Sequence, residues 1–149
     1  MIPQISQAPG LVQLVLTFLQ SLKEQGFTGD TATSYADRLT LSTDNSIYQL
    51  LPDAALFPRS TADVALIARL AGEPRFNSLV FTPRGGGTGT NGQSLNQGIV
   101  VDMSRYMNRI LEINTEQGWV RVEAGVVKDQ LNAWLRPYGF FFSPGAVDQ

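Results

Sequence analysis

Apolar and polar residues alternate along the chain in patterns that predict short helices and strands. Between residues 11 and 22, apolar side chains recur every three or four positions, which predicts an amphipathic helix that stops near Gly26. Such a helix can pack on the core of the protein or on a partner, and we favour the core. A second, more polar helix is expected over residues 31–41, followed by an irregular polar segment over residues 42–48. Within that segment, Thr43-Asp44-Asn45 is expected to be exposed to solvent.

The middle of the chain predicts strands that alternate with a helix. A short apolar strand over residues 54–57 is closed by Pro58. Ser60-Thr61-Ala62-Asp63 resembles a capping box, with Asp in place of Glu, at the start of a helix. Two further apolar strands are expected, over residues 79–82 and 99–103. The order strand, helix, strand, loop and strand predicts a parallel βαβ pair that is joined to a further strand.

The last third of the chain predicts a hairpin, a helix and a final strand. Apolar residues alternate with polar ones over residues 109–124, and a turn is expected at residues 116–118. A helix is expected over residues 127–138, and Phe140–Phe142 begin a last apolar strand. The whole pattern predicts a mixed fold of the α/β (α+β) class, with a small parallel or mixed sheet and flanking helices.

A glycine-rich loop lies between the strands predicted in the middle of the chain. Five of the ten residues from Pro83 to Gly92 are glycine. Glycine has no Cβ, so successive N–H groups can turn towards one point and form a concave site that suits a phosphate or pyrophosphate. The alternative is a flexible surface loop, but ordering each residue of such a loop costs about 1–2 kcal/mol of backbone entropy. A loop so rich in glycine between apolar strands therefore favours an anion-binding site.

The loop differs from two common nucleotide-binding motifs. Residues 87–92 match the pattern G-x-G-x-x-G, but in the Rossmann unit the third glycine opens a helix, and an acidic residue follows about 20 residues later. Here residues 93–98 are too few and too polar for such a helix, and Asp102 comes too early. No Gly-Lys-Ser/Thr sequence follows, which excludes a Walker loop. The donors are therefore expected to be loop amides between two strands.

Composition narrows the possible chemistry. The 149 residues fit one domain, and a net charge of −2 with scattered basic residues does not favour nucleic-acid binding. The absence of cysteine and histidine excludes disulfides, thiol chemistry and cysteine-ligated iron–sulfur clusters, and removes the commonest general base and zinc ligand. No transmembrane segment is expected, because the apolar stretch at residues 11–22 is short and interrupted by polar residues. A cytoplasmic location is the default expectation.

Four motifs in the same order resemble one known family. They are "FPRSTADVALIARLA", "FTPRGGGTGTNGQ", "GIVVDMSRYMNRILEIN" and "WVRVEAGVVKDQLNAWL", and the preceding stretch "STDNSIYQLLPDAALFPRS" also fits the resemblance. Together they resemble the N-terminal part of the FAD-linked oxidases that are related to vanillyl-alcohol oxidase and p-cresol methylhydroxylase. Within that family they are most similar to the D-lactate and D-2-hydroxyglutarate dehydrogenase branch. The resemblance covers about residues 40–142 and implies the N-terminal subdomain of a vanillyl-alcohol-oxidase-type FAD-binding domain.

The resemblance also implies which residues meet the cofactor. The FAD pyrophosphate would be surrounded by backbone amides, with two threonine hydroxyls as further donors, from Arg84, Gly85, Gly86, Gly87, Thr88, Gly89, Thr90 and Asn91. Gln93 and Ser94 would lie against the same ligand. Pro58 would lie near the adenine or ribose, and Gly125 would approach the cofactor closely. Alternatively, Pro58 is only structural and Gly125 only ends a strand.

The resemblance further implies how the flavin is held and what the chain lacks. Some relatives attach FAD covalently through a histidine in the glycine loop, but the matching position here is Thr88, so we expect non-covalent FAD. The catalytic residues stay unknown, because Asp102 and Glu123, the nearest carboxylates, are expected to pair structurally. We expect no metal or iron–sulfur ligands in this chain.

We therefore expect a fragment of a D-2-hydroxy-acid dehydrogenase. Residues 1–41 would form an N-terminal helical segment and residues 42–149 the N-terminal part of a FAD-binding domain, whose remainder and a separate cap domain lie outside this chain. Alone it would be inactive and would bind FAD weakly at best. One alternative is another flavoenzyme of this fold, such as a cell-wall precursor reductase or an alcohol or sugar oxidase. The other is a non-enzymatic nucleotide-binding or assembly module that self-associates through uncovered apolar surface.

Overall fold

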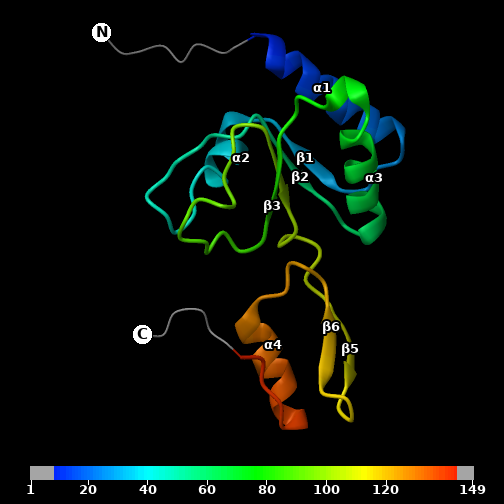
Figure 1. Cartoon of the computed structure of the whole chain (residues 1–149), viewed down its shortest axis with the longest axis vertical. Coiled ribbons are helices and arrows are strands. Elements are labelled where there is room, and N and C mark those ends of the chain that lie inside the picture. Colours follow the sequence, from blue (N-terminus) through cyan, green and yellow to red (C-terminus); the bar gives the residue numbers. More distant parts are fainter. Residues whose placement is uncertain (1–8, 144–149) are drawn as a thin grey trace.

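The structure, a computed structural model, describes residues 9–143. Figure 1 shows these residues as two lobes that follow one another along the chain. The first, here called the sheet lobe, comprises residues 9–107 and holds a four-stranded sheet with its helices. The second, the hairpin lobe, comprises residues 108–143 and holds a two-stranded hairpin and one longer helix. The mixed α/β fold predicted from the sequence is confirmed.

Three parallel strands form the centre of the sheet lobe. β2 (Ala54–Phe57), β4 (Ile99–Asp102) and β3 (Phe81–Arg84) lie side by side in that order and run in the same direction. β1 (Asp30–Ala32) pairs antiparallel with β2, so the sheet is mixed. All residues of β2 and β4 are buried, as is usual for parallel strands that are covered on both faces.

The order of the strands corrects one expectation. The strands predicted at residues 54–57 and 99–103 are confirmed as β2 and β4, and β3 begins two residues later than predicted. The predicted βαβ pair is wrong in one respect, because β4 lies between β2 and β3 and the two strands that the helix connects do not pair. Three β-branched apolar residues in β4 suit this central place, where both faces are buried.

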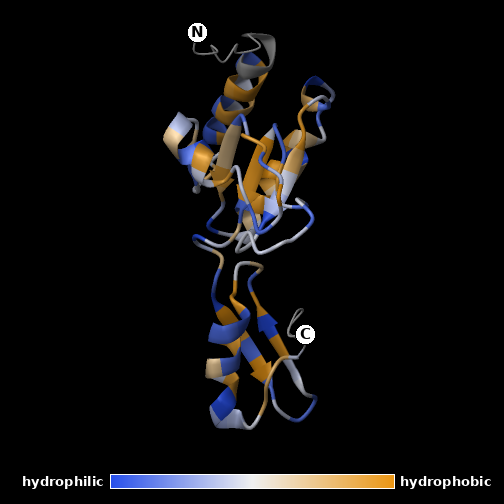
Figure 2. Cartoon of the chain, turned by 90° about the vertical axis from the view of Figure 1, so that its left-hand side faces the viewer, coloured by the Kyte–Doolittle hydropathy of each residue, from blue (hydrophilic) through white to orange (hydrophobic). Residues whose placement is uncertain are grey.

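Alternate side chains of the strands fill two separate cores, because successive residues of a strand point to opposite faces. The larger core lies between the sheet and two helices, α1 (Pro9–Glu24) and α3 (Thr61–Ala71). Its buried residues are Val15, Phe18, Leu19, Leu22, Ala54, Leu56, Leu66, Ile67, Leu70, Phe76, Leu79, Ile99 and Val101. The smaller core lies on the opposite face, near α2 (Tyr35–Thr40), and contains Leu41, Ala55, Phe57 and Val100. Figure 2 shows the apolar strands between these layers.

Helix α1 packs on the larger core, as predicted. The ring of Phe18 meets the ring of Phe76, in the short 3-10 helix η1 (Pro74–Phe76), edge-on with 5.0 Å between centroids. Both rings are fully buried. Among residues 9–143, no helix is long and apolar enough to cross a lipid bilayer. The division of the chain at residue 41 stays a prediction, although α1 and the strands share one core.

The helix predicted over residues 31–41 is wrong at its N-terminal end. Residues 30–32 form β1, and only Tyr35–Thr40 form helix α2. The Ser34 hydroxyl caps α2 by accepting a hydrogen bond from the Asp37 amide at 3.2 Å. Main-chain pairing with β2, which is distant in the sequence, therefore decides the conformation of residues 30–32.

The hairpin lobe follows its prediction up to residue 138. β5 (Ile110–Asn114) and β6 (Trp119–Val122) form the hairpin, and Gly118 turns the chain with a φ of 67°. Helix α4 (Lys128–Leu135) continues into the short 3-10 helix η2 (Arg136–Tyr138). These two helices occupy the range in which one helix was predicted.

The strand predicted at Phe140–Phe142 is wrong. No strand among the described residues pairs with these three residues. Instead, the side chain of Asn132 binds the main chain of Phe142, accepting from its amide at 2.6 Å and donating to its carbonyl at 3.3 Å. The three phenylalanine side chains remain exposed, with 76% of Phe141 accessible to solvent.

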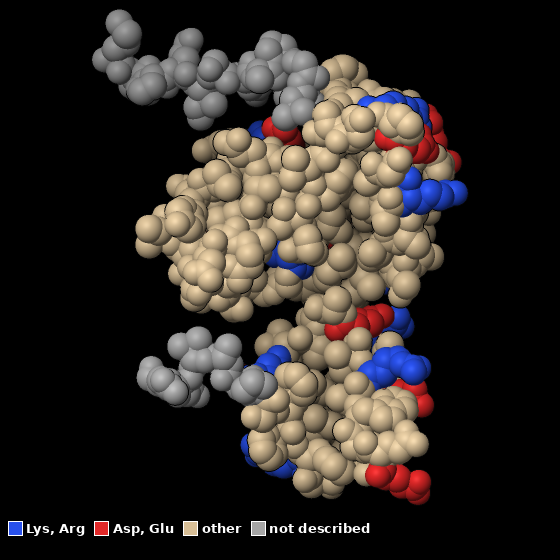
Figure 3. All heavy atoms as spheres, viewed as in Figure 1, with Lys and Arg blue, Asp and Glu red and all other residues tan. Residues whose placement is uncertain are grey.

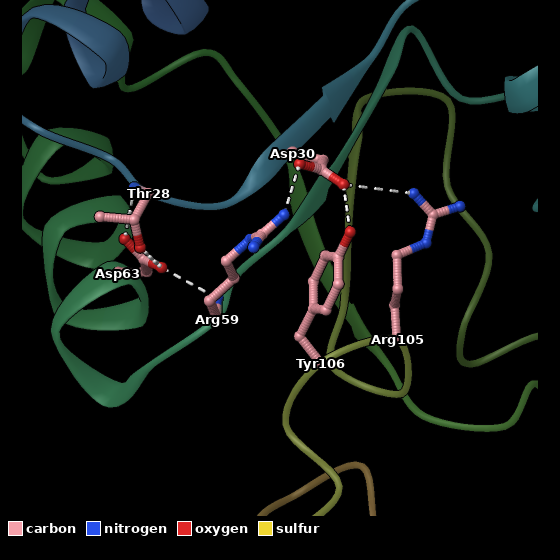
Figure 4. Close-up of polar contacts among 6 residues, drawn as sticks. All are labelled: Thr28, Asp30, Arg59, Asp63, Arg105 and Tyr106. Atoms are coloured by element: carbon pink, nitrogen blue, oxygen red, sulfur yellow. Dashed lines mark hydrogen bonds and ion pairs between the residues drawn. The ribbon is translucent and has the colours of Figure 1, made fainter.

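A buried carboxylate fixes the start of α3. The Ser60 hydroxyl accepts from the Asp63 amide at 3.2 Å, which confirms the first half of the predicted capping box. The Asp63 carboxylate accepts from the Thr28 amide at 2.9 Å, the Thr28 hydroxyl at 2.8 Å and the Arg59 amide at 2.8 Å (Figure 4). Burial acts to raise the pKa of Asp63, but these hydrogen bonds outweigh it and hold the pKa below its usual value.

Replacing Asp63 by Asn is expected to lower the free energy of unfolding by about 2–3 kcal/mol at neutral pH, because a buried acceptor of several hydrogen bonds is lost. The folded-state pKa lies below the unfolded one, so this stabilisation is full above the unfolded pKa of about 3.9 and is lost as the pH falls through the folded pKa. Urea unfolding at neutral pH and in acid measures both effects. Asp129→Asn, at an exposed position of α4, is the matched control, and an equal loss in the two variants would contradict the prediction.

Candidate functional site

Three parallel strands end at the same edge of the sheet. Because β2, β3 and β4 run in one direction, the residues that follow each strand lie at their shared carboxyl edge. These are Pro58–Ser60 after β2, the glycine loop (residues 85–92) after β3 and residues 103–106 after β4. In Figure 1 this edge is the underside of the sheet lobe, facing the hairpin lobe. Ligands of open α/β sheets bind outside the carboxyl ends of the strands.

The backbone of the glycine loop leaves its amides available. Among residues 9–143, no acceptor is bonded to the amides of residues 85–90, while the Asn91 amide donates to the Gln93 side chain at 3.1 Å. Of the five glycines, only Gly87 and Gly92 have positive φ, at 67° and 72°. The loop can therefore offer several free donors to an anion, as the sequence predicts. That these donors converge on one point stays a prediction.

Two glycines of the loop lie close to neighbouring side chains. A Cβ on Gly87 would lie 2.3 Å from Nη2 of Arg84, and a Cβ on Gly89 would lie 2.3 Å from Nε2 of Gln93. Arg84 is buried and hydrogen-bonded, so a side chain at Gly87 would press on a fixed group, whereas the exposed side chain of Gln93 can turn away from Gly89. A Cβ on Gly85, in contrast, would meet nothing within 4 Å. The side chains of Arg84 and Gln93 thus contact the backbone of the loop.

The guanidinium of Arg84 points into the protein. Only 9% of Arg84 is exposed. Its Nη2 donates to the Thr43 carbonyl at 2.9 Å and its Nη1 to the Ser94 hydroxyl at 3.4 Å, while its Nε lies 3.9 Å from Oδ2 of Asp102. The side chain therefore supports the base of the glycine loop, and the contact of Arg84 with a pyrophosphate, expected through its backbone, stays a prediction.

Ser94 is hydrogen-bonded to Asp44, a residue that the sequence predicts to be exposed to solvent. Its hydroxyl donates to Oδ2 of Asp44 at 3.1 Å, and Oδ1 of Asp44 accepts from the Ser46 amide at 2.8 Å. Hydrogen bonds from Ser46, aided by that from Ser94 and by the charge of Arg84, hold the pKa of Asp44 below its usual value. The expected solvent exposure of Thr43-Asp44-Asn45 is thus wrong for Asp44, which is half-buried. The polar residues on either side of Asp44 in the sequence do not indicate that it binds Ser94.

Pro58 and Gly125 lie in crowded surroundings. Pro58 is fully buried at the end of β2. A Cβ on Gly125 would lie 2.3 Å from the Met103 carbonyl oxygen and 2.7 Å from that of Met107, and the Gly125 amide donates to the Met107 carbonyl at 2.7 Å. Close approach of the chain following β4 therefore explains this glycine without a ligand. Whether either residue also contacts FAD stays a prediction.

A charged cluster at the same edge escaped the sequence analysis. Asp30 of β1 accepts a hydrogen bond from the Tyr106 hydroxyl, lies 3.2 Å from Nη2 of Arg59 and lies 3.7 Å from Nη1 of Arg105 (Figure 4). The Arg59 guanidinium also lies over the Tyr106 ring, and that of Arg105 over the Phe57 ring. The hydrogen bond from Tyr106, with those arginines, holds the pKa of Asp30 below its usual value. One carboxylate thus faces two guanidinium groups, and the Asp63 carboxylate lies next to them, where it accepts a hydrogen bond from the Arg59 amide.

The two carboxylates considered nearest to the site are occupied, as expected. Oδ1 of Asp102 accepts from the Ser104 amide at 2.8 Å and the Ser104 hydroxyl at 2.6 Å. Glu123 accepts from the Arg109 side chain at 2.7 Å and from its amide at 2.9 Å, and these bonds hold the pKa of Glu123 below its usual value. Within the part of the chain that the structure describes, no three His, Cys, Asp or Glu residues are grouped as metal ligands.

The surface above the glycine loop carries few charges. On the face shown in Figure 3, Lys, Arg, Asp and Glu gather over α1 and α3 and on the hairpin lobe, and the left part of the sheet lobe is nearly free of them. Small exposed hydroxyl and amide side chains, at Thr88, Thr90 and Asn91, stand beside the free backbone donors. Uncharged donors at the carboxyl edge of a parallel sheet fit the diphosphate of a dinucleotide.

Comparison with known proteins agrees with this geometry. A model of the family described as "FAD binding domain" matches residues 52–149. Over 144 residues the chain is 89% identical to a D-2-hydroxyglutarate dehydrogenase of Pantoea ananatis and 81% identical to one of Escherichia coli. Each alignment covers 97% of this chain and 14% of the relative, so the chain spans a small part of the length of these enzymes.

Solved structures confirm the fold implied by the sequence motifs. An alkyldihydroxyacetonephosphate synthase matches with a TM-score of 0.69 and 20% sequence identity, over 93% of this chain and 27% of that one. At this identity the likeness concerns the fold alone, and it agrees with the mixed α/β fold of the described residues. With a family match over more than half of its residues, the chain belongs to the FAD binding domain family.

Proposed function

We propose that this chain supplies the diphosphate-binding part of the FAD site in a D-2-hydroxy-acid dehydrogenase, and that D-2-hydroxyglutarate is the substrate. The observation that carries the proposal is the row of backbone amides at residues 85–90, which have no bonded acceptor among the described residues. These amides lie at the carboxyl edge of a parallel sheet, where dinucleotides bind in related architectures. The names of the relatives support the choice of substrate.

In this proposal the chain binds and orients the cofactor. The amides of residues 85–90 and the hydroxyls of Thr88 and Thr90 donate to the diphosphate, and Gln93, Ser94, Pro58 and Gly125 line its surroundings. Arg59 and Arg105 lie at the same edge as the loop, and both face Asp30. The flavin is held without a covalent bond, since Thr88 stands where some relatives have a histidine.

The reaction itself needs groups that lie outside the described residues. Bound FAD supplies the acceptor for the hydride that leaves C2 of the hydroxy acid. Asp102 and Glu123 are engaged in hydrogen bonds and ion pairs, so neither is free to take the hydroxyl proton. The proton acceptor and the substrate-binding residues then belong to the remainder of the flavin domain and to a cap domain. A cytoplasmic location stays a prediction.

Replacing Gly87 by Ala is expected to weaken FAD binding at least about tenfold, or 1.4 kcal/mol. The positive φ disfavours a side chain, and the new Cβ would press on the Arg84 guanidinium. Calorimetric titration of the protein that carries this chain with FAD measures the effect. Gly118→Ala is the matched control, because Gly118 has the same φ of 67° but lies in the hairpin turn. FAD binding that is equal in wild type and Gly87→Ala would contradict the proposed role of the loop.

The protein that carries this chain is expected to oxidise D-2-hydroxyglutarate faster than D-lactate, and the 149-residue chain alone is expected to oxidise neither. Reduction of an artificial electron acceptor measures both rates. Faster turnover of D-lactate would change the substrate, while oxidation of an alcohol or sugar would favour the other flavoenzymes of this fold. Turnover by the isolated chain with stoichiometric flavin would contradict the view that it lacks the catalytic base.

The assembly alternative is favoured by one observation, the exposed apolar surface of the hairpin lobe. Phe140, Phe141 and Phe142 are exposed together, and they lie beside Trp119 of the hairpin strand β6. We therefore expect the isolated chain to dimerise through this surface at high concentration, because contiguous apolar patches associate in water. Light scattering should show a concentration-dependent mass that Phe141→Ser reduces to that of a monomer. A monomeric wild-type chain at all concentrations would contradict this, and added FAD tests whether the association depends on the ligand.

A further inference from the structure

The segment before β2 makes contact with both ends of the glycine loop. We propose that residues 43–49, here called the brace, hold the glycine loop in its ligand-binding shape, and that Asp44 is a positioning residue that acts through Ser94. The consequence for affinity rests on the proposed function of the loop as a diphosphate site. The mechanical role of the brace does not, because it is defined by contacts within the chain.

The brace is a closed turn with a shape of its own. Its ends meet in an isolated bridge between Thr43 and Gln49, and the Leu50 amide donates to the Ser42 carbonyl at 2.9 Å. Inside the turn, the Asp44 carboxylate accepts from the Ser46 amide, and the Ser46 hydroxyl accepts from the Tyr48 amide at 3.1 Å. These bonds allow the segment to act as a fixed support, although it contains no helix and only that bridge.

Three contacts join the brace to the glycine loop. The Thr43 carbonyl accepts from Arg84, just before the loop, and the Asp44 carboxylate accepts from Ser94, just after it. Tyr48 lies against Gly92 so closely that a Cβ there would be 3.0 Å from Cδ2 of its ring. The brace therefore holds both ends of the loop, and the flexible glycines between them span a fixed gap. Fixing the ends lowers the entropy that the loop loses when it orders around a ligand.

The charge of Asp44 fixes which groups donate and which accept in the hydrogen bonds that join Asp44, Ser94 and Arg84. An ionised carboxylate only accepts hydrogen bonds, so the proton of the Ser94 hydroxyl points to Asp44. The lone pairs of that hydroxyl then face Nη1 of Arg84, which donates to it at 3.4 Å. Arg84 in turn lies against Gly87 at the middle of the loop. Asp44 thus reaches the loop through two buried side chains, and the hydrogen bonds from Ser46 and Ser94 hold its pKa below the usual value.

The test combines loop dynamics with ligand affinity. In Asp44→Asn, backbone ¹⁵N order parameters of residues 85–92, measured without ligand, are expected to fall from about 0.85 to below about 0.6. The amides of β2 and β4 should keep their wild-type values. FAD affinity should fall about tenfold. Glu116→Gln makes the same change of charge at the exposed hairpin turn and should alter neither quantity.

A double-mutant cycle identifies the path. Ser94→Ala is expected to weaken FAD binding about as much as Asp44→Asn, and the double variant no more than either, because the two residues act in series. Additive effects overturn the proposal, as do order parameters equal to wild type in Asp44→Asn. Loosening of the whole sheet lobe also overturns it, since Asp44 would then serve general stability. If the protein that carries this chain binds no FAD, the proposed function fails, and the order parameters alone still decide whether the brace holds the loop.

Discussion

The architecture of the site depends on one buried charge. The Arg84 guanidinium is almost fully removed from water, and a buried charge is costly unless it is paired and hydrogen-bonded. Its partners come from three separate segments: the carbonyl of Thr43, the hydroxyl of Ser94 and, more distantly, the carboxylate of Asp102. Satisfying this single group therefore brings together the segment before β2, the end of β4 and both ends of the glycine loop. The hydrogen bonds of the Arg84 guanidinium therefore position the loop, together with the conformations that its glycines allow.

Local patterns predicted the elements that depend on local physics. The sequence predicted three such elements: the apolar strand β2, the capped start of α3 at Ser60 and the hairpin turn at Gly118. Each depends on side-chain periodicity or on a preferred residue type. What failed was decided over long distances. β1 exists because its main chain pairs with β2, β4 enters between strands that are adjacent in the prediction, and Phe140–Phe142 have no partner strand among the described residues.

The candidate site likewise contains residues that local patterns predicted and residues whose place depends on contacts between distant segments. The glycine run marked the loop, and its free amides agree with the predicted anion site. The direction of the Arg84 and Ser94 side chains could not be read from the sequence, because both turn towards a segment some 40 to 50 residues away. The cluster around Asp30 was equally hidden, since Tyr106 lies 76 residues further along the chain. Residues of this kind are found only when the fold brings the segments together.

The contact at Gly125 limits which residue can stand where the two lobes meet. A Cβ there would lie 2.3 Å from the carbonyl oxygen of Met103 and 2.7 Å from that of Met107, so both obstacles are main chain. Side chains can yield by changing rotamer, but a peptide group cannot. The joint between the lobes therefore tolerates no added methyl group, and any larger residue at this position would have to displace the segment that links β4 to the hairpin.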